Sequence, residues 1–367
     1  MVNRHGSNHS CDGINDSTWI VGGLIARSRK PHIPVWAIMA AASTFTVLTG
    51  LEPLGELDKA IDLDVVLFLV GMFSLVGLTE ESGLLKVIVM KLISWANTTR
   101  GMLVYTSLVM GLLAAFAVND TVALMGPPMV RAMAKITGLN PVPLFLILAF
   151  SITIGSTMTP MGNPQNLLIA MQSGISAPFM KFMLVLTIPT ILNLVLTPLV
   201  VMRIYNIENR EFKGSLIISE EHLTNKRDAV IAAVFFTVTV AILVVNDVLE
   251  IMGFRWIEHR GFIPFIMASL AYILSSNPRA VLNRVDWGTI IFFITMFITM
   301  DGVWRSGLLQ KWLLHILPGK PESLVAEFLI LTVISLLLSQ VLSNVPFVKL
   351  FIDYLKSIGY NGEDVRA

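Results

Sequence analysis

The chain has 367 residues, of which 54% are hydrophobic and only 14% are charged, and its formal net charge is +1. A soluble domain usually carries about 25% charged residues, so this composition indicates a multi-pass membrane protein. The small net charge gives no reason to expect a nucleic-acid partner. A single cysteine, Cys11, excludes a disulfide framework.

Residues 1–32 are expected to form a polar tail with a partial first helix, because only a short stretch near their end is apolar. The start of this tail lacks the apolar core of a cleaved signal peptide. His5, His9 and Cys11 lie in the tail, where nothing would fix the geometry of metal ligands, so we expect no metal there.

The rest of the chain alternates apolar segments with short polar connections. Two amphipathic stretches, near 82–97 and 305–317, have the pattern of helices that lie along a membrane surface. The apolar segments fall at 33–51, 65–79, 102–118, 121–134, 143–171, 180–202, 229–249, 261–275, 287–303 and 324–350.

Asn119, Asp120 and Thr121 lie between two apolar arms that are too short to cross a bilayer. Basic residues stand at the outer ends of both arms, and basic residues favour the cytoplasmic side. We therefore predict a re-entrant hairpin whose tip reaches the middle of the membrane. An ionisable group at that depth is costly and usually functional, so Asp120 is a candidate for binding Na⁺ or a coupling proton. The alternative is that Asp120 only caps the second arm.

A second polar segment, Gly155 to Asn166 (GSTMTPMGNPQN), interrupts one of the most apolar stretches of the chain. Pro160 and Pro164 cannot continue a helix, and Gly155 and Gly162 allow a close approach of two backbones. Unwound backbone inside a bilayer must be buried in protein or line a wet cavity. We therefore predict a broken helix at a binding site, against the alternative of a kinked packing helix. The polar side chains of this segment are Ser156, Thr157, Thr159, Asn163, Gln165 and Asn166.

The second half of the chain repeats short patterns of the first half. Four matches keep their order at a shift between about 224 and 230 residues, and one of them pairs Asn119 with Asn344. The charges place the two copies in opposite orientations, which is typical of secondary transporters. We expect a first repeat at 33–205, a cytoplasmic linker at 206–228, and a second, incomplete repeat at 229–367.

The Asn-Asp-Thr tip, the Gly155 to Asn166 segment and the later Ser343-Asn344-Val-Pro-Phe tip together resemble the ion transporter superfamily. The nearest branch is that of the arsenite-permease and citrate-transporter-like anion permeases, over about residues 33–358. This resemblance implies an all-α multi-pass fold of two inverted repeats, each with a re-entrant hairpin and a broken helix. It also implies elevator-like transport on a dimeric scaffold, with binding at both tips and both breaks.

On this sequence, the resemblance places the site at Asn119, Asp120 and Thr121, at Gly155 to Asn166, and at Ser343 and Asn344. The repeat shift places a second broken helix beyond residue 367, so the chain has the pattern of a truncated permease.

The predicted function is secondary active transport of a small anion or oxyanion across the cell membrane, driven by Na⁺, H⁺ or the membrane potential. Two alternatives stay open: a Na⁺/H⁺ antiporter and a non-functional truncated remnant. We expect no cofactor apart from a coupling ion. No catalytic constellation is apparent, so we do not expect an enzyme.

Overall fold

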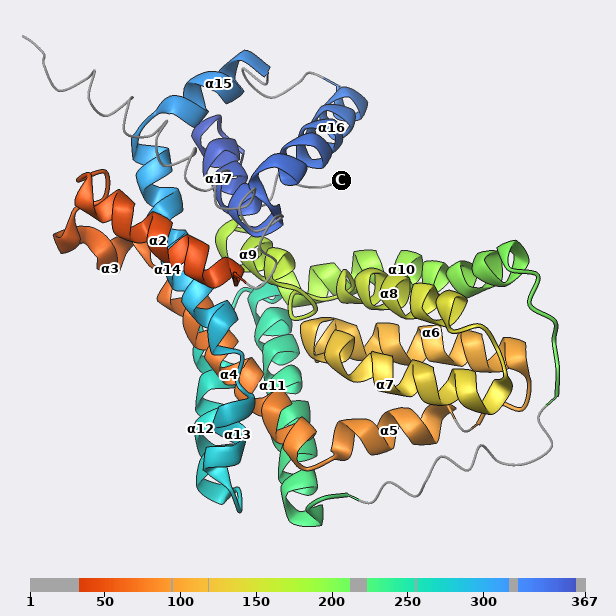
Figure 1. The fold of residues 1–367 in the computed structure, drawn as a ribbon. Coiled ribbons are helices and arrows are strands. Elements are labelled where there is room, and N and C mark those ends of the chain that lie inside the picture. Colours follow the sequence, from red (N-terminus) through yellow and green to blue (C-terminus); the bar gives the residue numbers. More distant parts are fainter. Residues whose placement is uncertain are drawn as a thin grey trace, which may run out of the picture. The chain divides into compact units, whose positions relative to one another are not determined.

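A computed structural model describes residues 33–93, 95–117, 119–211, 223–254, 256–316 and 323–360. The polar tail with His5, His9 and Cys11, residues 212–222 of the predicted linker and the last seven residues lie outside these ranges. Apart from one isolated bridge between Thr98 and Glu211, the regular structure of the described residues is helical (Figure 1). The expected all-α fold is thus confirmed.

Five described helices are long and apolar enough to cross a membrane: Leu63–Glu81, Thr99–Phe116, Pro178–Ile204, Lys226–Ile251 and Trp287–Arg305. Four shorter apolar helices accompany them. One of these, Pro141–Ser156, precedes the predicted helix break, and another, Val325–Gln340, lies in an arm of the second predicted tip. The two amphipathic stretches are also helical, as α5 (Leu84–Ile93) and α15 (Leu308–Ile316).

The chain divides into two compact units, and each is described on its own. The first unit contains residues 1–69, 171–176 and 286–367. Its helices are α2 (Val35–Leu48), η1 (Leu54–Glu56), α3 (Leu57–Ala60), the start of α4 (Leu63–Glu81), α14 (Trp287–Arg305), α15, α16 (Leu324–Leu342) and α17 (Asn344–Ser357).

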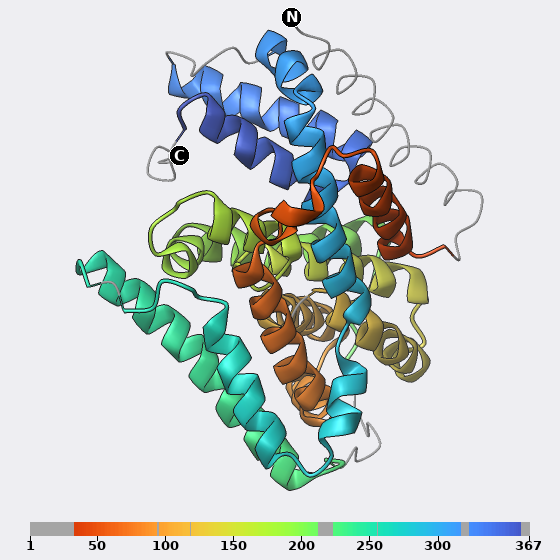
Figure 2. The same ribbon diagram turned by 90° about the vertical axis from the view of Figure 1, so that its left-hand side faces the viewer.

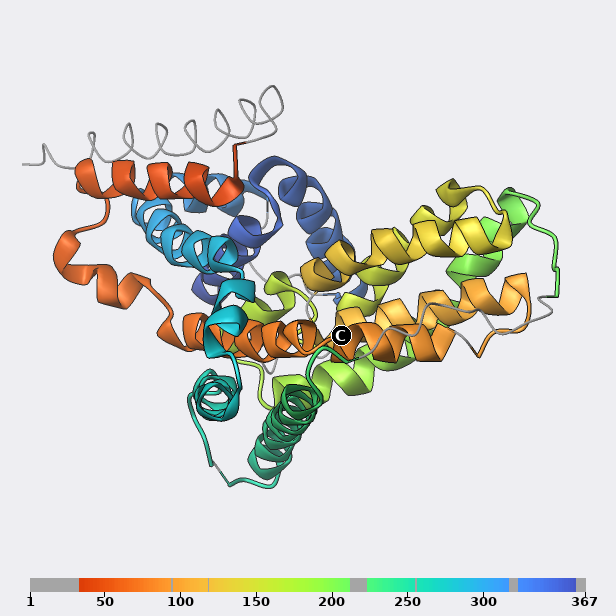
Figure 3. The same cartoon turned by 60° about the horizontal axis from the view of Figure 1, so that its bottom comes forward.

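Within the first unit, α2 packs along α14 (Figure 3). The two helices approach closely because Gly302 has no side chain: a Cβ atom there would lie 2.2 Å from Cγ2 of Thr46. Helices α16 and α17 form a hairpin, the second hairpin, around a core of Ile334, Phe347 and Phe351. The rings of Phe347 and Phe351 are stacked, with centroids 5.0 Å apart.

The second unit contains residues 70–170 and 177–285. Its helices are the end of α4, α5, α6 (Thr99–Phe116), α7 (Asn119–Thr137), α8 (Pro141–Ser156), most of α9 (Pro164–Gln172), α10 (Pro178–Ile204), α11 (Lys226–Ile251), α12 (Phe262–Leu274) and α13 (Pro278–Arg284).

Helices α6 and α7 form the first hairpin, which packs against α8 and α10. Its core is made of aliphatic and methionine side chains that are almost fully buried, including Met102, Leu103, Val130, Ile147 and Leu148. Helices α11 and α12 pack against each other in the same unit (Figure 2), and they share a core with Leu75 and Leu78 of α4.

The predicted hairpin arms therefore exist as two helices that meet at Asn119. Helix α7 continues through Pro127 and Pro128, and it ends only at Thr137.

Candidate functional site

The predicted helix break lies between α8 and α9. Helix α8 ends at Ser156, and the chain then forms turns and bends over residues 157–163 before α9 begins at Pro164. Proline is favourable at the first position of a helix, because the N–H group that it lacks would have no partner there. Pro164 therefore starts α9 as well as ending the irregular segment, and the prediction of a break in this helix is confirmed.

Gly155 and Gly162 are needed because the backbone is crowded at both positions. A Cβ atom on Gly155 would lie 2.0 Å from the carbonyl oxygen of Gly111 on α6. A Cβ atom on Gly162 would lie 2.2 Å from the carbonyl oxygen of Ser156. Neither contact is sterically allowed, so any side chain would push two backbones apart.

The side-chain amides of the break bind the carbonyl groups that the end of α8 leaves free. Asn163 Nδ2 donates to the carbonyl oxygen of Ser156 at 3.0 Å. Asn166 Nδ2 lies within donating distance of three carbonyl oxygens, those of Ser156, Thr157 and Thr159, at 3.3, 3.0 and 3.2 Å. These bonds hold the turn open as a fixed loop, which an unwound backbone inside an apolar environment requires.

The first hairpin contacts this loop directly. The backbone N–H of Asn119 donates to the carbonyl oxygen of Gly162 at 3.0 Å. The hydroxyl of Thr159, which is buried, donates to the carbonyl oxygen of Ala115 near the end of α6. The structure thus brings the predicted tip and the predicted break together within one unit.

One predicted side chain at this junction keeps an unused hydrogen-bonding group. Asn119 Oδ1 is buried and has no hydrogen-bond partner among the described residues. A buried acceptor without a partner costs about 1–3 kcal/mol, so a bound cation or hydroxyl group would relieve that cost. Gln165 is half-buried in the first turn of α9, whose N-terminus attracts anions.

The other predicted site residues take these positions. Asp120 and Thr121 lie in the first turn of α7, and Thr157 is exposed at the end of α8, where its hydroxyl lies 3.4 Å from that of Thr190. Ser343 and Asn344 form the exposed connection of the second hairpin, in the other unit, and Ser343 has a φ of +68°, which is strained for a serine. Their place in the site stays a prediction.

Sequence reasoning missed a line of hydrogen bonds that fixes α8 against its neighbours. Ser107 on α6 donates to the carbonyl oxygen of Leu194 on α10 at 2.6 Å, and accepts from Ser151 on α8 at 2.8 Å. Single serines in apolar helices are common, and the sequence holds no signal that these two face each other. These hydrogen bonds hold α8, the first half of the broken helix, against α6 and α10.

A second missed cluster holds the start of α10, shortly after α9. Ala177, which has a φ of +47°, donates its N–H to Glu250 at 3.0 Å, and Met180 donates to Asp247 at 3.0 Å. Both carboxylates also bind Arg260. The side chain of Asp247 is fully buried, and it caps another helix.

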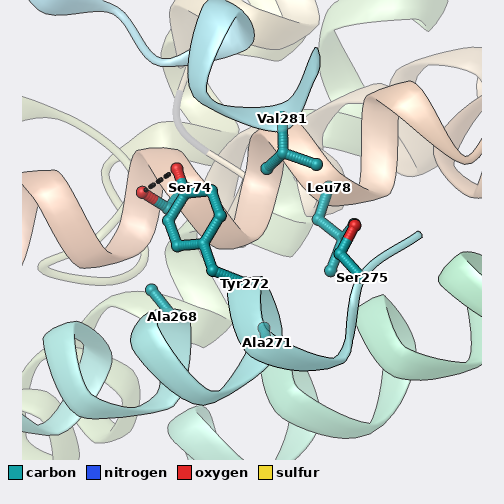
Figure 4. A pocket seen from close by; sticks show the side chains of 7 residues that line it. All are labelled: Ser74, Leu78, Ala268, Ala271, Tyr272, Ser275 and Val281. Carbon is teal, nitrogen blue, oxygen red and sulfur yellow. Dashed lines mark hydrogen bonds between the residues drawn. The ribbon is translucent and has the colours of Figure 1, made fainter. Parts of the chain in front are cut away.

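Two further hollows in the second unit are poorer candidates. The first, between α4, α12 and α13, is lined by small and apolar side chains, and Tyr272 donates there to Ser74 at 3.0 Å (Figure 4). It has no room for a water molecule, so it is a packing contact. The second, a cavity of about 250 Å³ beside Arg260 and Trp256, adjoins the cap of α10.

No group of three or more His, Cys, Asp or Glu side chains within the described ranges could hold a metal ion. The helix break offers neutral donors and acceptors together with the ends of two helices, and such a site suits a small ion that exchanges water for protein dipoles.

A helical chain with several membrane-length apolar helices and a polar interruption in another apolar helix defines a multi-pass integral membrane protein. A family model described as "Citrate transporter" (CitMHS) matches residues 21–365. The chain therefore belongs to this family, and it is a transporter and not an enzyme.

Curated proteins with similar sequences agree with this assignment. An uncharacterized transporter of Mycobacterium tuberculosis is 24% identical over 319 residues, which cover 84% of this chain and 71% of the relative. Inner membrane protein YbiR of Escherichia coli is 29% identical over 303 residues, which cover 81% and 72%. A 46 kDa membrane protein of Mycobacterium leprae is 24% identical over 353 residues, which cover 90% and 77%.

Proposed function

We propose that this protein is a secondary active transporter of a small anion or oxyanion, such as a carboxylate, arsenite or an inorganic anion. The description of its family favours a carboxylate among these. Transport is coupled to Na⁺, H⁺ or the membrane potential, and it proceeds by elevator-like movement of the part that carries the substrate. The repeats at 33–205 and 229–367 and a homodimeric assembly belong to the same proposal.

The observation that carries this proposal is the hydrogen bond between Asn119 N and Gly162 O. It joins the first residue of α7, at the tip of a helical hairpin, to the irregular segment of a broken helix, so the ends of two pairs of helices meet in one place. A packing helix with a simple kink would need neither the hairpin contact nor the capped helix ends of the break.

In the proposed site, neutral dipoles bind the substrate, and a carboxylate takes part in binding the coupling cation. Gln165, in the first turn of α9, binds the anion, because Pro164 has no N–H and the N–H of Asn166 is held by Asn163 Oδ1. Asn119 Oδ1, which has no protein partner among the described residues, and Asp120 next to it bind the coupling cation. A site without lysine or arginine suits a substrate of low charge, because a highly charged anion would need cationic partners.

Transport by protein reconstituted in liposomes tests the proposal. Asp120→Asn should abolish the dependence of substrate uptake on the Na⁺ or H⁺ gradient, and should leave membrane insertion and folding intact. Glu208→Gln is the matched control, because the side chain of Glu208 is 76% exposed and pairs with the exposed Arg210. Uptake by Asp120→Asn with an unchanged gradient dependence would refute the role of this carboxylate.

A Na⁺/H⁺ antiporter is the second candidate, because Asp120 stands at the hairpin tip and could itself exchange the two cations. The two functions differ in whether an anion is needed. Addition of Na⁺ to liposomes with a pH gradient and no permeant organic or oxyanion should leave that gradient intact if the protein is an anion transporter. Rapid loss of the gradient that Asp120→Asn prevents would favour the antiporter.

A further inference from the structure

A compact group of charged side chains lies in the first unit, far along the chain from the helix break. It consists of Glu52, Glu56, Asp301 and Arg305, and we call it the Arg305 cluster. Glu52 belongs to the loop that follows α2, and this loop is held against the end of α14 by the close packing at Gly302, where a Cβ atom would also lie 3.5 Å from Leu51.

One guanidinium group serves three carboxylates in this cluster. Arg305 Nε lies 2.8 Å from Asp301 Oδ2 and 2.9 Å from Glu52 Oε2, and Arg305 Nη1 lies 2.9 Å from Glu56 Oε2. If all three carboxylates were ionised, the cluster would carry two uncompensated negative charges. Like charges this close disfavour the ionised form of at least one of them.

The single hydrogen on Arg305 Nε determines which carboxylate is left without a hydrogen bond. That hydrogen is directed to Asp301 Oδ2, with which Nε forms a hydrogen bond. Glu52 is near the same nitrogen but receives no hydrogen from it, and neither of its oxygens has a hydrogen-bond partner among the described residues. The side chain of Glu52 is also fully buried, with 0% of its surface exposed.

A proton on Glu52 resolves both problems. The neutral acid loses the repulsion and becomes a donor, with the Asp301 carboxylate as its acceptor. In agreement with this geometry, the pKa of Glu52 is raised to about 7 by burial, by the hydrogen bond that its protonated form can donate to Asp301 and by the negative charge of Asp301, against the opposing effect of Arg305. The pKa of Glu56, which Arg305 binds directly, is lowered instead.

We propose that Glu52 and Asp301 form a carboxyl pair that binds one exchangeable proton, as a site separate from the helix break. The charged groups that act on the pair are Arg305 from α14 and Glu56 from η1, with Lys59 of α3 acting on Glu56. Helix α2 contributes no charged side chain. When the proton is bound, Glu52 donates to Asp301 and holds the loop on α14; when it leaves, two adjacent carboxylates repel each other and the loop loosens.

Infrared difference spectroscopy of the purified full-length protein tests the proposal without any assumption about transport. Ordinary carboxyl groups are already ionised at neutral pH, so a carboxylic acid band that disappears as the pH rises through about 7 reports an unusual acid such as Glu52. Glu52→Gln should remove this band. Glu56→Gln should keep it, because Glu56 binds the same arginine but lies outside the pair.

Absence of any carboxylic acid band that titrates in the neutral range would overturn the proposal, and so would a band that survives in Glu52→Gln. If Glu52→Gln does not fold, Asp301→Asn provides the second test. It removes the neighbouring negative charge, so the midpoint of the band should move to lower pH. An unmoved midpoint would contradict a shared proton.

Thermal stability gives an independent reading with a defined sign. The folded-state pKa of Glu52 is above the unfolded value, so ionisation is disfavoured in the folded state and stability falls as pH rises from 4.5 towards about 7. The melting temperature of the wild type should therefore drop across this window, and Glu52→Gln should flatten that part of the profile. Equal slopes in the two proteins would argue against the pair.

Discussion

The two helical hairpins of this transporter differ in what surrounds them. In the first hairpin, Met102, Leu103 and Ala114 of α6 are fully buried, and the tip is hydrogen-bonded to the helix break. In the second hairpin, α16 has a broad exposed apolar face; the side chains that are more than half exposed are Val325, Phe328, Leu329, Val333, Leu336 and Leu337. The two hairpins therefore differ in packing: the first is packed around a polar site within its own unit, whereas the second leaves one apolar face of α16 exposed.

Charge separates the hairpins as well. Lys349 and Asp353 lie five and nine residues after Asn344, and their side chains form an ion pair with distances of 3.1 and 2.8 Å to the two carboxylate oxygens. The positions five and nine residues after Asn119 are Leu124 and Pro128. The second hairpin thus contains a partly buried charge pair where the first hairpin has uncharged side chains, and such pairs are rare in membrane segments unless they have a function.

The largest expected effect is at the backbone contact of the first hairpin. Gly155→Ala should cost about 4 kcal/mol or more of stability, because its Cβ would meet the carbonyl of Gly111 and side-chain movement cannot relieve a clash with backbone. Thermal unfolding in detergent measures this. Gly55→Ala is the control, since nothing lies within 4 Å of a Cβ there. Equal melting temperatures of the two variants would contradict the contact.

Truncation of the same side chain in both hairpins should show their difference in packing. Leu103→Ala on α6 should destabilise the protein by about 3 kcal/mol, because a fully buried leucine leaves a cavity. Leu336→Ala on α16, where the side chain is 66% exposed, should change the stability by less than about 0.5 kcal/mol. If the two truncations cost the same in detergent, the exposed face of α16 is packed in solution.

The charge pair of the second hairpin is expected to have a smaller effect on stability. Lys349→Met leaves Asp353 without its partner and should cost about 1–2 kcal/mol. The double variant Lys349→Met, Asp353→Leu should recover most of that loss, because it removes the unpaired charge. A double variant with normal stability and no transport would show that the pair acts in function; one as unstable as the single variant would show that the pair is needed for folding.

The smallest effect is expected at the helix break itself. Asn166→Ala removes the amide that binds the carbonyl groups after Ser156 and should cost about 1 kcal/mol, together with a clear loss of substrate affinity. Asn193→Ala is the matched control, because its side chain is exposed and makes one bond within its own helix. Substrate affinity measured by scintillation proximity should separate the variants, and unchanged affinity in Asn166→Ala would exclude the break from the site.

The parts of the fold that the sequence predicted depend on local chemistry. Pro164 and Gly162 indicate a helix that stops and restarts, and the polar residues from Asn119 onward indicate the turn between two short apolar helices. These features depend on residues that are neighbours in the sequence, and the structure has them at the expected positions. Helix α7 runs on through Pro127 and Pro128 because its packing in the hairpin outweighs the local cost of the two rings.

The parts that could not be predicted depend on residues far apart in the chain. Glu52 and Asp301 each look like ordinary acidic residues at the end of an apolar segment, and only the packing of α2 on α14 makes them a pair. Ser107 and Ser151 become a line of hydrogen bonds only once α6 and α8 are in register.

The start of α10 has a consequence for engineering and for comparing relatives. Its first turn has no capping side chain of its own. Instead, Asp247 and Glu250 on another helix accept hydrogen bonds from its N–H groups, and Arg260 binds these carboxylates. Chimeras that exchange the segment before α10 between family members will need to exchange these three side chains with it. Across homologues, the identities at these distant positions should change together.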